Sequence, residues 1–245
     1  MRLLIINGGN SGLGAELLEN FALMSDSIIV VGRNTVHENK IGSIITRISS
    51  ENVVSELKEY SLENNILWDD ILLINNAGIL GEIGLIGDLK LDDFQDAVKI
   101  NLLLPLELLN SVFSLLKFRK FDAINISSGV SLKPQPGWII YSACKAFLNS
   151  LSRSINIDSQ FRRESIFVNV RSVSINPGPI DTLMQSKIRN LNVETFPNVE
   201  LFKNLYRTNT LRSAAIVASK IVELYKTDNL FNVEYIDFND VKIWQ

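Results

Sequence analysis

The chain is poor in the residues that build metal centres and disulfide frameworks. It has one cysteine and one histidine among 245 residues, so an internal disulfide is excluded and no metal site is expected. The net charge is also low, at −3, and indicates neither a nucleic-acid surface nor a membrane surface. No apolar run approaches the ~18 residues that span a bilayer, and the first apolar stretch meets glycines too soon for a signal peptide. We therefore expect a cytoplasmic protein.

The composition is that of a globular protein, with 46% apolar and 21% charged residues. Strand-like and helix-like segments alternate, which predicts an α/β fold with a doubly wound, parallel sheet of about seven strands. We expect one domain over residues 1–245. The expected strands lie near residues 2–6, 27–32, 43–48, 71–75, 121–126, 166–175 and 233–237. The expected helices lie near residues 12–24, 51–64, 92–117, 139–160 and 211–227.

A glycine-rich segment separates the first expected strand from the first expected helix. Glycines let a backbone approach a pyrophosphate closely, and the following helix N-terminus offers free N–H donors with a partial positive charge. A flexible glycine turn is the alternative, but a strand before it and a helix after it favour dinucleotide binding. The residues expected to line the nucleotide are Gly8, Asn10, Ser11, Gly12, Leu13 and Gly14.

Tyr141 and Lys145 form a second motif, because in a helix they lie one turn apart on the same face. An ammonium beside a phenol favours the phenolate, so we expect Lys145 to lower the pKa of Tyr141 from about 10. That change would prepare a general acid/base, with Ser128 supplying a hydroxyl to the same space. The spacing alone most often marks an ordinary amphipathic helix; it counts here because the glycine loop is an independent signal.

Taken in order, these motifs make the chain resemble the short-chain dehydrogenase/reductase family over nearly its whole length. The ordered match adds Asn75-Asn76-Ala77-Gly78, Asn101 and Pro177-Gly178 to the two motifs above. The resemblance implies a Rossmann-type fold that binds a nicotinamide cofactor. It implies a catalytic group consisting of Ser128, Tyr141, Lys145 and Asn101, in which Tyr141 donates a proton, Lys145 holds the nicotinamide ribose and Asn101 completes a water-mediated proton path. It also implies cofactor contacts from Tyr141, Lys145, Asn76, Ala77, Gly78, Pro177, Gly178, Ile180 and Thr182.

The choice between NAD(H) and NADP(H) depends on the end of the second strand. An NAD site usually carries an acid about 20 residues past the glycine loop, but no acid is present there, and Arg33 with Asn34 follows the strand instead. A guanidinium pairs well with a 2′-phosphate, so we predict NADP(H). The alternative is that Arg33 is a solvated loop cation. After the third strand, Arg47 or Ser49 occupies the place of the family's adenine-contacting Asp, so that contact cannot be carried over.

Two further segments resemble the sepiapterin reductase branch of the family, which includes benzil-reductase-like bacterial relatives: residues 127–138 and residues 177–185. Asp237 matches the place of an Asp that anchors a pterin ring in that branch, although a strand-end carboxylate in water or capping a turn is a nearly equal reading. Trp138 is a candidate wall of the substrate pocket, or a residue that packs the loop onto the next helix. Residues 180–210 are the expected substrate lid.

The predicted activity is NADPH-dependent reduction of a small carbonyl substrate, either a ketone, a diketone or a pterin side chain. Two alternatives remain: the same reaction on a sugar or acyl intermediate, and a non-catalytic dinucleotide sensor, which the intact Ser128, Tyr141 and Lys145 disfavour. The helix near 92–117 carries more leucine than one buried stripe requires. The resemblance implies that the fourth and fifth helices pair with a second subunit, so we expect a homodimer or homotetramer.

Overall fold

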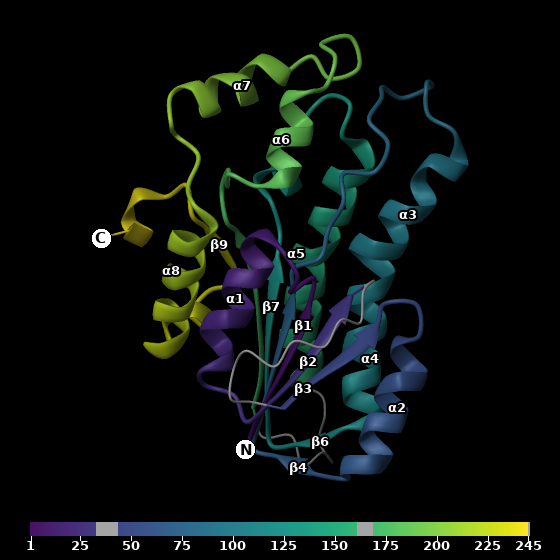
Figure 1. The fold of residues 1–245 in the computed structure, drawn as a ribbon, viewed down its shortest axis with the longest axis vertical. Coiled ribbons are helices and arrows are strands. Elements are labelled where there is room, and N and C mark those ends of the chain that lie inside the picture. The colour runs from purple at the N-terminus through teal and green to yellow at the C-terminus, as the bar shows by residue number, and fades with distance from the viewer. Residues whose placement is uncertain (33–43, 161–168, 245) are drawn as a thin grey trace.

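A parallel, seven-stranded sheet forms the centre of the molecule (Figure 1). The structure is a computed structural model, and it describes residues 1–32, 44–160 and 169–244. The strand order is β3-β2-β1-β5-β7-β8-β9, and every neighbouring pair runs parallel. The bounds are β1 Arg2–Asn7, β2 Ser27–Gly32, β3 Ile44–Ser49, β5 Asp70–Asn75, β7 Lys120–Ile126, β8 Asn169–Asn176 and β9 Tyr235–Asp237. The predicted fold class and strand number are confirmed.

Helices cover both faces of this sheet, which explains why its central strands lack an alternating pattern. In β1, Leu4 and Ile6 face one core, while Leu3 and Ile5 face the other, and all four are fully buried. The first core is closed by α1 (Gly12–Ala22) and α8 (Ala214–Lys226). The second core is closed by α2 (Val53–Asn64), α4 (Leu104–Leu115) and α5 (Ile139–Ser159).

The long apolar segment near 92–117 is not one regular helix. It begins with a 3₁₀ turn at Leu91–Phe94, continues through α3 (Gln95–Val98) and a π-helical turn at Lys99–Leu103, and ends with α4. By length and composition, Asp92–Leu115 could cross a membrane, and 33% of its most apolar window is buried inside the protein. Its apolar surface therefore exceeds what the core of this chain covers.

Several elements differ from the sequence predictions. The helix near 92–117 ends at Leu115, because Lys117–Phe118 forms β6 and pairs with β4 (Leu67–Trp68) in a separate two-stranded sheet. The expected lid contains two helices that its irregular pattern did not predict, α6 (Leu183–Arg189) and α7 (Val199–Arg207). Short 3₁₀ turns lie at Gly129–Ser131, Asn229–Phe231 and Val241–Trp244.

Candidate active site

The glycine loop joins β1 to α1 at the carboxyl edge of the sheet, where doubly wound folds bind ligands. Its glycines are required sterically. Gly8 has φ of 80°, and a Cβ there would lie 2.7 Å from the Ala77 Cα, while a Cβ on Gly14 would lie 2.0 Å from the Gly8 carbonyl oxygen. Asn76 Nδ2 donates to the Gly8 carbonyl at 2.9 Å. The loop is thus held tightly against the segment that follows β5, with the close backbone approach that a pyrophosphate site needs.

Other residues predicted for the cofactor surround this loop. Thr182 lies over it, because a Cβ on Gly12 would lie 3.4 Å from the Thr182 Cγ2, and its hydroxyl caps α6 by accepting from the Gln185 N–H at 3.4 Å. Gly178, with φ of 74°, donates its N–H to Asn176 Oδ1. Leu13 and Ile180 bury their side chains in the core, which leaves only their backbones for a ligand. These residues fit a dinucleotide phosphate between the loop and the start of the lid.

Tyr141 and Lys145 project from one face of α5 as expected, and both are buried. The Lys145 Nζ lies 5.7 Å from the centre of the Tyr141 ring and donates to the Ile126 carbonyl at 2.8 Å. Ser128 is half-buried, lies after β7 at the start of the 3₁₀ turn Gly129–Ser131, and shares a hydrogen bond with Tyr141. Ser127 has a different role, since its hydroxyl donates to the Lys145 carbonyl at 3.1 Å. The predicted Ser-Tyr-Lys group is therefore brought together.

The pKa of Tyr141 moves opposite to the prediction. Burial raises the pKa of Tyr141 to about 12, and the hydrogen bond with Ser128 lowers it only in part. Burial also lowers the pKa of Lys145 to about 8. The prediction was wrong because it counted the lysine charge and omitted desolvation: the ammonium points to a backbone carbonyl, and both groups lie away from water.

Asn101 lies in the π-helical turn, fully buried. Its Oδ1 accepts from the Ile79 N–H at 2.8 Å, and its Nδ2 donates to the Ile79 carbonyl at 2.7 Å. A Cβ on Gly78 would lie 3.4 Å from Asn101 Oδ1 and 3.2 Å from Lys145 Nζ, so the three residues meet at one point. π-Turns often occur at functional sites. This one lets Asn101 hold the chain that leaves β5 against Lys145.

Trp138 connects the site to the lid. Its ring stacks on Phe196 at 4.6 Å between centroids and 5° between planes, and it meets the Tyr141 ring edge-on at 5.7 Å. Phe202 of α7 completes this aromatic cluster, 5.3 Å from Trp138. The sequence did not reveal that Met184 of α6 would also reach the site, where its Sδ lies 3.9 Å from the Tyr141 hydroxyl. The expected lid therefore packs directly against Tyr141.

Asp237 lies at the end of β9 and is occupied by local contacts. Its Oδ1 accepts from Asn176 Nδ2 at 2.8 Å and from both the backbone N–H and the Nδ2 of Asn239 at 2.9 Å. This arrangement favours the turn-capping reading of Asp237 over the pterin anchor. Arg33 and Asn34 lie outside the described residues. Arg47, on β3, donates from Nη1 to Asn10 Oδ1 at 3.0 Å, so it reaches the glycine loop.

Comparison with known proteins agrees with this geometry. Residues 2–192 match a family model described as short chain dehydrogenase. Benzil reductase ((S)-benzoin forming) of Bacillus subtilis is 29% identical over 232 residues, covering 91% of this chain and 93% of that protein. The Bacillus cereus protein of the same name is 30% identical over 256 residues, covering 98% and 100%. Sepiapterin reductase of Rattus norvegicus is 32% identical over 181 residues, covering 70% and 64%.

Solved structures show the same fold. The crystal structure of the KRED1-Pglu enzyme superposes with a TM-score of 0.77 at 21% identity, covering 96% of this chain and 100% of that one. A short chain dehydrogenase/reductase from Burkholderia phymatum in complex with NAD gives 0.73 at 18% identity, covering 96% and 88%. A short chain dehydrogenase from Shigella flexneri complexed with NADP gives 0.70 at 21% identity, covering 96% and 95%. With the family match, these findings establish that the chain belongs to the short chain dehydrogenase family, in its benzil and sepiapterin reductase-like branch.

Proposed function

We propose that this protein is an NADPH-dependent reductase of small carbonyl compounds, with aromatic 1,2-diketones as its preferred class. The observation that carries the proposal is the convergence of Ser128, Tyr141 and Lys145 beside the glycine loop, under a lid that brings aromatic side chains to Tyr141. The cofactor, when bound, would supply the hydride. The absence of an acid after β2, where Arg33 follows in the sequence instead, supports NADP(H) over NAD(H).

Tyr141 is suited to give a proton rather than to take one. With its pKa raised to about 12, the phenol is protonated at neutral pH and can donate to the alkoxide that forms from the carbonyl. Ser128 would place a hydroxyl donor on the same oxygen, where charge develops in the transition state. Lys145 is cationic below a pH of about 8 and lies beneath the phenol ring, so it stabilises negative charge as the proton leaves.

The lid favours a flat aromatic substrate. Trp138, Phe196 and Phe202 form one aromatic cluster that extends from Tyr141 into α7; Trp138 and Phe196 are buried against each other, so the cluster would make an apolar backing for the space beside Tyr141. The Bacillus relatives act on benzil by name, which supports the same class here. Because Asp237 Oδ1 is already engaged by Asn176 and Asn239, a diketone is a better match than a pterin.

The activity can be tested by NADPH oxidation at 340 nm against benzil, 1-phenyl-1,2-propanedione, sepiapterin and a keto-sugar, with NADH in parallel. We expect turnover of the diketones with NADPH. Tyr141→Phe should lower kcat by roughly 100- to 10,000-fold, since it removes the general acid. Tyr60→Phe is the matched control, because Tyr60 lies on α2 away from the site and is 8% exposed, as is Tyr141. Wild-type turnover by Tyr141→Phe would refute the mechanism.

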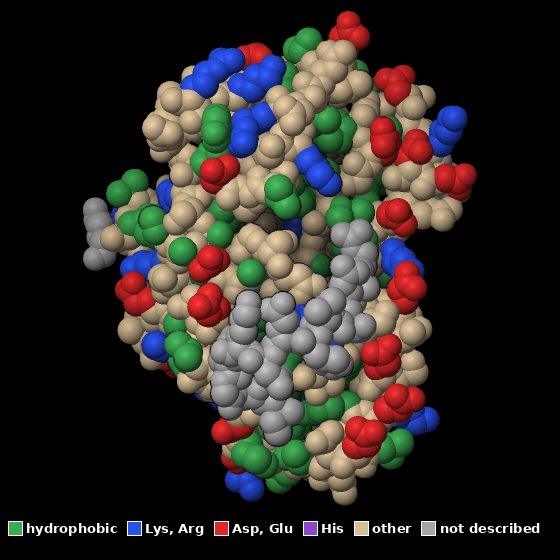
Figure 2. Space-filling model, in the orientation of Figure 1, with side chains coloured by type: hydrophobic (Ala, Val, Ile, Leu, Met, Phe, Trp, Pro, Cys, Tyr) green, Lys and Arg blue, Asp and Glu red, His purple; other side chains and the backbone are tan. Residues whose placement is uncertain are grey.

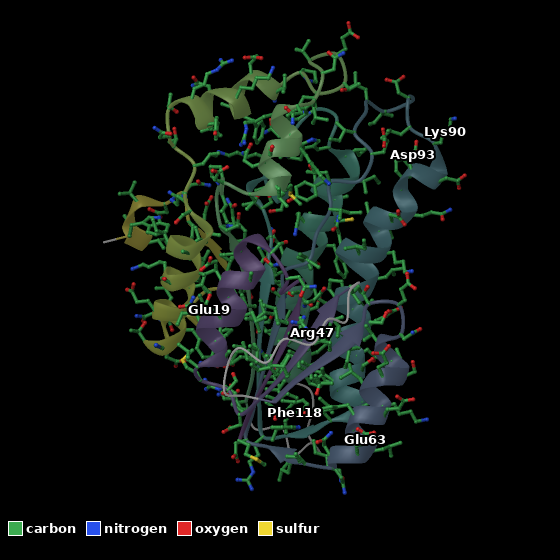
Figure 3. The ribbon with its side chains drawn as sticks, in the orientation of Figure 1. Glu19, Arg47, Glu63, Lys90, Asp93 and Phe118 are labelled. Carbon is green, nitrogen blue, oxygen red and sulfur yellow. The ribbon has the colours of Figure 1, made fainter. Side chains whose placement is uncertain are left out.

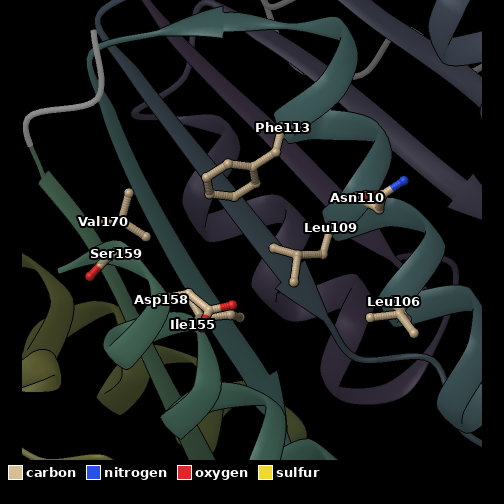
Figure 4. Close-up of a pocket in the computed structure, with 8 residues that line it drawn as sticks. All are labelled: Leu106, Leu109, Asn110, Phe113, Ile155, Asp158, Ser159 and Val170. Carbon is tan, nitrogen blue, oxygen red and sulfur yellow. The ribbon is translucent and has the colours of Figure 1, made fainter. Parts of the chain in front are cut away.

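We also propose a homodimer or homotetramer that covers the outer face of α4 and α5. A groove of 190 Å³ lies there, lined mainly by side chains of these two helices (Figure 4). Leu103 and Leu106 of this face are 43% and 42% exposed, and Ile157 of α5 is 53% exposed. Burying such a face against its symmetry-related copy removes apolar surface from water.

A further inference from the structure

Arg47 occupies an unusual place for a charged residue. It lies within β3, opposite Val30 of β2 in the parallel register, and its guanidinium is half-buried. Figure 3 labels it at the centre of the view, among the strands, whereas the labelled carboxylates Glu19 and Glu63 lie on the outer helices. Its Nη1 donates to Asn10 Oδ1 at 3.0 Å. A strand residue thus places a positive charge against the glycine loop.

Among the described residues, one donor of the Arg47 guanidinium lacks an acceptor. Arginine has five N–H donors, and the Nε of Arg47 is buried with no hydrogen-bond partner. Within the described part of the chain, no carboxylate pairs with it, whereas Arg2 and Arg171 are paired with Asp70 and Asp122. A buried donor left unpaired carries a free-energy cost, and an anionic acceptor removes that cost. The site is therefore prepared for an anion supplied from outside.

The position of Asn10 indicates which part of the nucleotide would supply this anion. A Cβ on Gly32, the last residue of β2, would lie 3.1 Å from the Asn10 Nδ2, so Asn10 contacts the end of β2 as well as Arg47. In doubly wound dinucleotide folds, the adenosine ribose lies beyond the end of the second strand. Arg47, Asn10 and Gly32 therefore meet where a 2′-substituent of that ribose belongs. In Figure 2, acidic side chains gather along the edge formed by α3, α4 and α2.

We propose that Arg47 selects the 2′-phosphate of the nucleotide, and that Asn10 positions its guanidinium for this contact. The inference rests on the proposed use of NADP(H) and adds a charge from β3 to the one that Arg33 is predicted to supply after β2. Stacking of the guanidinium on the adenine ring is the competing role. The two roles differ in an observable way, because stacking strengthens binding of any adenine nucleotide, whereas pairing with the phosphate strengthens binding only of nucleotides that carry it.

Isothermal titration calorimetry with 2′,5′-ADP and 5′-AMP separates these roles, since the two probes differ only in the 2′-phosphate. We expect the wild-type protein to bind 2′,5′-ADP more tightly. Arg47→Gln should weaken 2′,5′-ADP by roughly 10- to 100-fold and change 5′-AMP by less than about twofold. Asn10→Asp should produce a similar selective loss, because its carboxylate neutralises Arg47 and repels the phosphate. Arg153→Gln is the control, since Arg153 is 58% exposed and pairs with Glu234.

Each possible result of the titrations either supports or overturns the proposed role of Arg47. If Arg47→Gln retains the wild-type preference for 2′,5′-ADP, this inference is wrong while the use of NADP(H) stands. If Arg47→Gln weakens both probes equally while its melting curve is unchanged, the guanidinium contacts the shared part of the nucleotide and the inference is again overturned. If the wild-type protein shows no preference, both this inference and the proposed cofactor fail. Should Arg47→Gln not fold, Asn10→Asp decides, because Asn10 is exposed.

Discussion

Replacing Lys145 by methionine should stabilise the fold while abolishing activity. Lys145 is 3% exposed, and the pKa of its ammonium is lowered from 10.5 to about 8 because burial removes its water. Each pKa unit corresponds to ~1.36 kcal/mol, so holding this charge in the folded protein costs on the order of 3 kcal/mol. Methionine has a similar length and no charge, so the Lys145→Met protein avoids the cost.

The stabilisation should depend on pH in a defined direction. Because folding lowers the pKa of Lys145, the unfolded chain binds more protons between a pH of about 8 and 10.5. The free-energy cost of burying the ammonium in the wild-type protein is therefore fully present below a pH of about 8 and absent above pH 10.5. The Lys145→Met protein also loses the 2.8 Å hydrogen bond from Lys145 Nζ to the Ile126 carbonyl. This loss offsets part of the gain in stability at every pH, by roughly 1–3 kcal/mol.

Urea denaturation of both proteins at pH 7 and pH 10 provides the test. We expect the free energy of unfolding of Lys145→Met, relative to wild type, to fall by about 2.5 kcal/mol between these two pH values. Groups that do not interact with Lys145 titrate alike in both proteins and cancel in the difference; Cys144 does not, because Lys145 lowers the pKa of its thiol, so both measurements are repeated in a Cys144→Ser background. A relative stability that is the same at both pH values would show that Lys145 is not a desolvated ammonium, and the electrostatic account of the site would be refuted.

Three further predictions follow from the packing. Asp122→Ala should lower the free energy of unfolding by roughly 3–5 kcal/mol, measured by urea denaturation, because Asp122 is fully buried and accepts from Arg171, Lys120 and Tyr225; a loss below about 1 kcal/mol would contradict this. Gly14→Ala should abolish nucleotide binding by calorimetry, since its Cβ would lie 2.0 Å from a backbone oxygen; wild-type affinity would count against the loop geometry. Leu106→Arg should shift the mass measured by light scattering toward the monomer, and a wild-type protein that is already monomeric at micromolar concentration would contradict the proposed oligomer.

Much of the site was predictable because its residues lie in short, ordered motifs. Tyr141 and Lys145 are held at helical spacing by α5 alone, and the glycine loop needs only the local strand-loop-helix sequence. What failed was the sign of the Tyr141 pKa, because desolvation is set by everything packed around the phenol. The spacing of Tyr141 and Lys145 indicates that a lysine charge lies near the phenol, but it does not indicate how much water packing removes from the two groups.

The helices of the expected lid could not be predicted from the sequence either, because they too depend on packing between distant residues. Its irregular pattern did not predict α6 or α7, because their apolar residues face a small aromatic cluster on Trp138 rather than a broad core. The contact between Met184 and Tyr141 joins residues 43 positions apart, and no local signal marks it. Likewise, Asp237 could not be assigned from sequence, since Asn176, 61 positions away, reaches it only when β9 pairs with β8, although its other partner Asn239 lies two residues on.

The sequence by itself determined the fold class, the family and which residues form the candidate catalytic group, because alternating buried strands and helices and a set of closely spaced motifs are local properties of the chain. The tertiary structure alone decided how those groups are tuned and what surrounds them. Burial sets the pKa values of Tyr141 and Lys145, and the register between β2 and β3 brings Arg47 to the glycine loop. Desolvation and long-range pairing depend on distances between residues far apart in the chain, and only folding establishes those distances.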